Sequence, residues 1–258
     1  MSPQFVDFDG DGRLDIVAGI FDGSPHLVRG TAEGFGAPEQ ILDEDGARIV
    51  LNAFWNFDTK QWDETREHDV PGQGGKGHMT SAIAFDWDGD GDLDLLLGDH
   101  SSGRIFRRMN TGTPSAPKFS TINEPVLAAG QPLDVPGTVA TLRAIDWNKD
   151  GLLDLVCSGM GDAYGQGDSA GVYLFLNVGS KAGAAFGPRQ VLLAPTPKGG
   201  ARATAPHSGL YVDAGDLDGD GDLDLVVGGY SHWTAPGAEK TEAKREALVW
   251  WYENTTPR

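Results

Sequence analysis

The chain has 258 residues and a formal net charge of −18, from 38 acidic and 20 basic side chains. This acidity disfavours nucleic acid as a partner, because its phosphates would be repelled, and no apolar stretch is long enough to form a membrane span. The 37 glycines and 15 prolines are spread along the chain, which indicates many tight turns and one large all-β domain over residues 1–258.

One acidic motif, D-x-D-x-D-G-x-x-D, occurs four times, over residues 7–15, 86–94, 146–154 and 216–224. Only the third copy departs from it, with Asn148 at the third place and Lys149 where the other copies carry glycine. Side chains at positions one, three, five and nine of a tight loop can converge on one hard cation. The backbone carbonyl at position seven completes the shell, and glycine at position six permits the sharp turn.

The motif therefore predicts up to four bound Ca²⁺ ions. The expected side-chain ligands are Asp7, Asp9, Asp11, Asp15, Asp86, Asp88, Asp90, Asp94, Asp146, Asn148, Asp150, Asp154, Asp216, Asp218, Asp220 and Asp224, and the expected carbonyl ligands are Arg13, Asp92, Leu152 and Asp222. Four copies in matching context argue against the alternative that these are merely acidic turns. An EF-hand is disfavoured, because flanking helices and a glutamate at position twelve are missing.

Short apolar runs flank the motifs and predict strands in the same order in each unit. A first strand precedes the motif (81–85, 141–145), a second follows it (16–18, 95–97, 155–157, 225–227), a third leads to an asparagine (104–108, 172–176 and 248–252, before Asn110, Asn177 and Asn254), and a last segment follows Phe119 or Phe186 (125–127, 190–193). The motifs begin 79, 60 and 70 residues apart, a spacing near that of propeller blades.

Four strands per unit, repeated about an axis, predict an all-β fold, a β-propeller of four blades. The expected blade units are residues 1–50, 78–130, 138–195 and 207–258, with a long loop over 52–77. The last blade lacks its outer strand, so the blades form a closed small ring with an imperfect seam, are part of a larger ring, or associate between two copies. The unpaired edge at 248–252 favours some kind of pairing.

The motif, three apolar residues and glycine after it, and a later strand ending in asparagine resemble the FG-GAP/VCBS repeat superfamily over essentially the whole chain. The resemblance implies calcium loops between the first two strands of each blade, as in integrin α-subunit propellers and many secreted bacterial proteins. It implies that Asp7, Asp9, Asp11, Asp15 and their counterparts are the ligands. Such propellers serve as adhesion modules, lectins and polysaccharide lyases, so the resemblance leaves the activity open.

A second group of polar and aromatic side chains is expected on the face opposite the calcium loops. Residues just before the first strand and just after the second strand of a blade share that face. They predict a ligand-binding set of His78, His100, His207, His232, Trp55, Trp62 and Trp233. Such a set suits a catalytic acid/base group, a second metal site or a sugar-binding funnel. The alternative is that the histidines cap strands through hydrogen bonds.

The leading functional hypothesis is a calcium-stabilised extracellular binding module for a polysaccharide or protein ligand. The alternative is a polysaccharide lyase-type enzyme with His78, His207, Tyr230 and His232 as catalytic candidates, and a third possibility is a purely structural scaffold. Calcium loops of this type usually bind weakly, which suits surroundings outside the cell or in the periplasm. Residues 1–4 are no signal peptide, so any export signal is absent from this chain.

Overall fold

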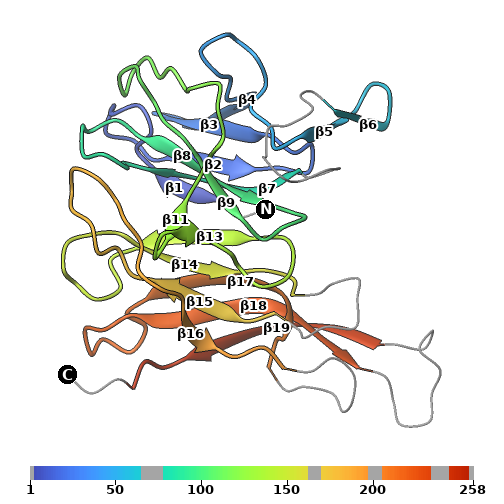
Figure 1. Cartoon of the computed structure of the whole chain (residues 1–258), viewed down its shortest axis with the longest axis vertical. Helices are drawn as coiled ribbons and strands as arrows, with labels where there is room; N and C mark the ends of the chain where they lie inside the picture. The colour runs from blue at the N-terminus through green and yellow to red at the C-terminus, as the bar shows by residue number, and fades with distance from the viewer. Residues whose placement is uncertain (1–2, 65–77, 162–169, 197–204, 234–243, 256–258) are drawn as a thin grey trace.

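The computed structural model describes residues 3–64, 78–161, 170–196, 205–233 and 244–255. The fold is all-β, and no helix occurs within these ranges. The strands form the four blades of a β-propeller, and each blade is an antiparallel sheet. In Figure 1 blades 1 and 2 (blue to green) overlap in the upper half of the view, and blades 3 and 4 (yellow-green to red) lie in the lower half.

Blades 1 to 3 each contain four strands in sequence order. Blade 1 consists of β1 (Gln4–Val6), β2 (Asp15–Gly19), β3 (Pro25–Thr31) and β4 (Gly34–Gln40). Blade 2 consists of β7 (Met79–Phe85), β8 (Asp94–Asp99), β9 (Ile105–Arg108) and β10 (Glu124–Pro125). Blade 3 consists of β13 (Thr141–Ile145), β14 (Asp154–Ser158), β15 (Val172–Phe175) and β16 (Gln190–Leu193).

Blade 4 has three strands, β17 (Ser208–Gly215), β18 (Asp224–Trp233) and β19 (Lys244–Tyr252). The expected absence of its outer strand is confirmed within the described residues, and β19 is an edge strand. Two small hairpins lie outside the blades: β5 (Ala53–Asn56) with β6 (Gln61–Glu64), and β11 (Leu127–Ala128) with β12 (Gln131–Pro132). The first hairpin occupies part of the segment expected as a loop over 52–77, of which 65–77 lie outside the described residues.

Each acidic motif connects the first two strands of its blade. The ninth residue of the motif pairs with the residue just before the motif, as in Val6↔Asp15 and Phe85↔Asp94. Blades 3 and 4 repeat this register with Ile145↔Asp154 and Gly215↔Asp224. The motif is thus a complete strand-to-strand connection, which we call loop 1 to loop 4 in chain order.

The hydrophobic core is divided into three parts, one between each pair of consecutive blades. Val17 and Leu27 of blade 1 pack with Leu95 and Phe106 of blade 2. Equivalent clusters join blade 2 to blade 3 and blade 3 to blade 4. Among the described residues, no core cluster joins blade 4 to blade 1, and Figure 1 places these blades at opposite ends of the molecule.

Candidate metal centres and the opposite face

The ninth aspartate of every loop is buried and holds three strands together. Its Oδ2 accepts a hydrogen bond from the backbone N–H of the second loop residue, from Phe8, Trp87, Trp147 and Leu217 in turn, at 2.9 to 3.0 Å. Its Oδ1 accepts another from a backbone N–H at or just beyond the end of the third strand, from Gly30, Asn110, Asn177 and Asn254 in turn, at 2.6 to 2.9 Å. The buried carboxylate therefore satisfies two backbone donors before any metal is considered.

In blades 2 to 4, the asparagine after the third strand adds a side-chain hydrogen bond to the loop. The side-chain amides of Asn177 and Asn254 donate to the carbonyl of the eighth loop residue, Leu153 and Leu223, both at 3.3 Å. In blade 1 the equivalent residue is Gly30. A Cβ at Gly30 would lie 2.4 Å from the carbonyl oxygen of Leu14, so the closer approach of the strands in blade 1 excludes a side chain.

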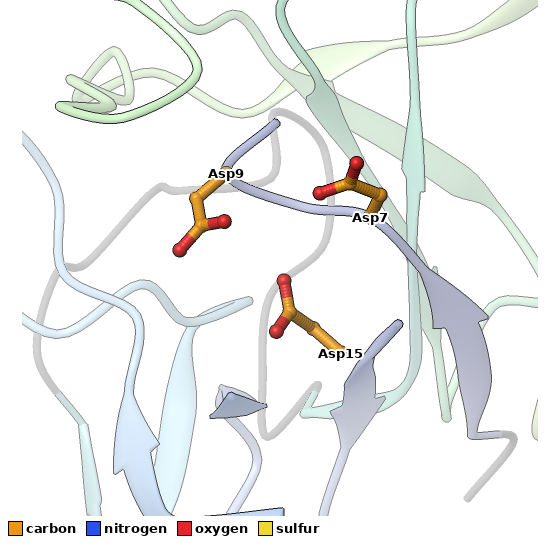
Figure 2. A group of neighbouring side chains, drawn as sticks. All are labelled: Asp7, Asp9 and Asp15. Atoms are coloured by element: carbon orange, nitrogen blue, oxygen red, sulfur yellow. The ribbon is translucent and has the colours of Figure 1, made fainter. Parts of the chain in front are cut away.

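Three of the four loops bring carboxylates together. Carboxylate oxygens lie within 4.8 Å of one another in the groups Asp7, Asp9 and Asp15; Asp86, Asp88 and Asp90; and Asp216, Asp218 and Asp220. Figure 2 shows the carboxylates of Asp7, Asp9 and Asp15 around a common space. Loop 3 forms no such acidic group, although all its residues are described, because Asn148 replaces one aspartate.

The residues of loops 1 and 2 fit a divalent cation on two grounds. Asp7 Oδ1 and Asp92 Oδ1 are buried carboxylate oxygens without a hydrogen-bond partner in the described chain. Burial and then the neighbouring Asp90, Asp88 and Asp86 raise the pKa of Asp92 to about 6. Burial likewise raises the pKa of Asp94 to about 7, against the hydrogen bonds from Asn110 and Trp87. A cation would remove this cost of ionisation, since it compensates the clustered negative charge.

Loop 1 differs from the others in having arginine partners. Arg29, in β3, pairs with Asp9 and also with Glu39 at 2.8 Å, while Arg13 pairs with Asp11 at 2.6 Å. The loop carboxylates are thus partly neutralised by the protein itself. The pairing of Arg29 with loop 1 was not anticipated from the sequence, because Arg29 lies 14 residues after the loop.

The four loops share their sequence pattern, their place between the first two strands and their hydrogen bonds to the ninth aspartate. The model of the FG-GAP-like repeat matches residues 86–157 and 146–227, which together cover more than half of the chain. The chain belongs to the FG-GAP repeat family. No curated protein matches it. Loop 1 of this FG-GAP protein lies outside the matched residues, yet Asp15 makes the same two backbone hydrogen bonds as its counterparts.

On the opposite face, the candidate ligand-binding residues separate into two groups. The first is a run of rings that we call the aromatic strip: Phe21, Trp55, Trp62, His78 and His100. Neighbouring ring centroids lie 6.1 Å apart for Phe21 and Trp55, 5.5 Å for Trp55 and Trp62, 4.4 Å for Trp62 and His78, and 4.2 Å for His78 and His100. The last pair is stacked, with 22° between the ring planes.

Phe21 was not among the residues selected from the sequence. It follows Asp15 by six residues, as His100 follows Asp94 and Tyr230 follows Asp224, so alignment of the blades by their motifs would have found it. Phe21 is exposed, whereas Trp55 and Trp62 are partly buried. The backbone N–H of Trp55 donates to the carbonyl of Asp22 at 2.7 Å, which fixes the β5–β6 hairpin beside blade 1.

The second group lies on blade 4. The backbone N–H of His232 donates to Nε2 of His207 at 2.8 Å, and Nδ1 of His207 lies 3.3 Å from Oγ1 of Thr196. Arg245 stacks over the ring of Tyr230 at 4.1 Å, and the rings of Tyr230 and His232 are 6.0 Å apart. Trp233 ends β18 opposite Lys244.

The geometry bears on the catalytic candidates. His207 accepts a backbone hydrogen bond on Nε2, so this nitrogen is occupied as in the strand-capping alternative. Burial and then His100 lower the pKa of His78 to about 4, and burial lowers the pKa of His100. The imidazole rings of His78 and His100 are therefore neutral at pH 7, and His78 is a weak base there. Their neutral, stacked arrangement suits contact with a ligand better than proton transfer.

We expect His78 to make folding sensitive to mild acid. Its folded-state pKa of about 4 lies below the ordinary value of 6.5, so the unfolded chain takes up the proton first and stability falls as the pH drops from about 6.5 towards 4. In saturating calcium, the thermal midpoint of the wild type should fall more steeply between pH 7 and pH 5 than that of His78→Asn. Parallel pH profiles for the two proteins would contradict this role.

Proposed function

We propose that this FG-GAP propeller is a calcium-stabilised extracellular binding module, and that its aromatic strip contacts a polysaccharide ligand. The observation that carries the proposal is the run of five neighbouring rings from Phe21 to His100. Aromatic faces bury the apolar faces of sugar rings, and the tips of Trp and His add hydrogen-bonding groups. A protein ligand would contact the same aromatic strip, because interface centres are rich in such residues.

The calcium part of the proposal is supported by the acidic groups of loops 1, 2 and 4 and by the buried oxygens of Asp7 and Asp92. When bound, the ion supplies positive charge that holds the first two strands of each blade at a fixed separation. The third strand of each blade is held by the protein itself, because the ninth aspartate accepts a hydrogen bond from the backbone at or just beyond its end.

An extracellular or periplasmic location is supported by the weak calcium affinity usual for such loops, which requires calcium-rich surroundings. The described residues contain no helix that could cross a membrane. The lyase-type enzyme remains an alternative prediction. The described contacts of His207 and Tyr230 do not favour it over the binding module.

Truncation of Trp62 should abolish most ligand binding. We expect Trp62→Ala to weaken retention in gels containing acidic or neutral polysaccharides by about tenfold or more, equivalent to at least about 1.4 kcal/mol, because Trp62 contacts Phe21, Trp55 and His78 in the strip. Trp250→Ala, which removes an exposed tryptophan of the last blade, serves as the matched control.

The same incubations distinguish the hypotheses. Retention that depends on Trp62 and leaves the polysaccharide intact supports the binding module, and ultraviolet-absorbing unsaturated products would instead support the lyase-type enzyme. Absence of retention and of products across glycan and protein ligands would leave only the scaffold hypothesis.

A further inference from the structure

The joints between blades 1 and 2 and between blades 2 and 3 contain the same aromatic contact. The second residue of a loop packs on a phenylalanine at the start of the fourth segment of the next blade. Ring centroids lie 6.3 Å apart for Phe8 and Phe119, and 5.9 Å apart for Trp87 and Phe186. Both receiving rings are buried. Each pairs through its backbone with the asparagine after the third strand, as Asn110↔Phe119 and Asn177↔Phe186.

Blade 1 has a phenylalanine at the receiving position of this contact, and among the described residues no preceding blade packs on it. The pairing Gly30↔Phe35 is equivalent to Asn110↔Phe119, since Gly30 binds Asp15 as Asn110 binds Asp94. Phe35 therefore corresponds to the buried Phe119, but 54% of it is exposed. It lies beside Phe5, also exposed, at a centroid distance of 6.2 Å.

Blade 4 has the donating half. Leu217 is the second residue of loop 4, equivalent to Phe8 and Trp87, and it is 50% exposed. The strands behind it repeat the pattern. In blade 3, Val156 pairs with Leu174, and both side chains are buried against blade 4. Their counterparts in blade 4 are Val226 and Trp251, which pair in the same way. Trp251 is exposed, and Val249 is 74% exposed.

We propose that a second copy of this chain supplies the missing neighbour: blade 4 of one copy stacks on blade 1 of the other in the geometry that joins consecutive blades, with Leu217 against Phe35 of the second copy. Each chain carries one donating face on blade 4 and one receiving face on blade 1, and Figure 1 shows these two blades at opposite ends of the molecule, so the faces meet between copies. The joint would bury Phe35, Leu217, Val249 and Trp251, and burial of such large apolar side chains drives association. Because the contact joins unlike faces, it is heterologous.

The composition of the two faces argues for this occupant. The first and last blades expose apolar residues at the positions that the inner blades bury against each other, so the interface continues one already present three times in the chain. A self-complementary contact of blade 4 with blade 4 would instead place two donating faces together and leave both Phe35 rings exposed. The proposal is independent of the ligand-binding function.

The test uses the full chain in saturating calcium. Sedimentation equilibrium should give a mass of twice 27.4 kDa or a higher multiple for the wild type. Phe35→Lys and Val249→Lys each remove one half of the joint, and both positions are exposed, so the fold should tolerate them. Each variant alone should therefore sediment at 27.4 kDa.

Mixing the two variants provides the decisive comparison. Phe35→Lys retains an intact blade 4 and Val249→Lys retains an intact blade 1, so an equimolar mixture should regain a mass of twice 27.4 kDa through one joint. Three results would overturn the proposal: a wild type that stays at 27.4 kDa at all concentrations, a Phe35→Lys variant that still associates by itself, or a mixture that stays monomeric. Circular dichroism of each variant confirms that a loss of mass is not a loss of folding.

Discussion

Removal of calcium by excess chelator should lower the thermal midpoint by on the order of 10 to 30 °C. Each occupied site stabilises the folded state by about 1.4 to 2.7 kcal/mol when calcium is ten to a hundred times its dissociation constant. For a domain of this size, 1 kcal/mol corresponds to roughly 2 to 4 °C. Several occupied loops therefore add up to a large shift, and the repulsion within the emptied carboxylate groups acts in the same direction.

The measurement is a pair of thermal melts that are monitored by circular dichroism. One melt contains millimolar calcium and the other contains chelator. Magnesium in place of calcium serves as the control and should restore only a small part of the stability, because it demands near-ideal octahedral geometry and gives up its water reluctantly. Identical midpoints in calcium and chelator would show that the acidic loops stabilise the blades without a metal.

Replacement of Asp94 by alanine should destabilise the protein in chelator as well as in calcium. Asp94 accepts hydrogen bonds from the partly buried backbone N–H of Trp87 at 2.9 Å and from the buried N–H of Asn110 at 2.6 Å. Two backbone donors left without partners cost about 1–3 kcal/mol each. We therefore expect a loss of about 3 kcal/mol or more, corresponding to a midpoint lower by roughly 6 to 12 °C.

Asp88→Asn is the matched control within the same loop, since Asp88 is an exposed member of the carboxylate group. It should lower the midpoint only when calcium is present, and in chelator the effect should stay within about 0.5 kcal/mol. Denaturant melts of both variants, each with and without calcium, check the distinction. If Asp94→Ala matched the wild type in chelator, the role of Asp94 would be confined to the metal.

Much of the blade architecture was predictable from the sequence, because the motif recurs and the apolar runs around it have a constant order. The loops, the first three strands and the edge at Leu248–Tyr252 follow from these local patterns. The departures lie where one blade differs from the others. Gly30 replaces the asparagine of its counterparts, and blade 1 has a shorter turn before Phe35, so its equivalence to Phe119 becomes visible only through the pairing register.

The opposite face was predictable only as a list of residue types. Strand length places His78, His100, His207 and His232 on one face, but it does not determine which rings meet. The β5–β6 hairpin brings Trp62 to His78, and this contact depends on how a segment between two blades docks. The pairing of Arg29 with Asp9 is likewise a tertiary contact, which no spacing within loop 1 encodes.

The division of the core into three separate parts makes this molecule behave as a one-dimensional array. Among the described residues, each core cluster joins a blade only to the next blade in sequence, so stability is a sum of nearest-neighbour terms, as in repeat proteins. Within a single copy, the inner blades are held from two sides and the outer blades from one, so in the monomer fraying starts at blades 1 and 4. Loops 1 and 4 therefore lie in the least cooperative parts of the monomer, and they open before loops 2 and 3.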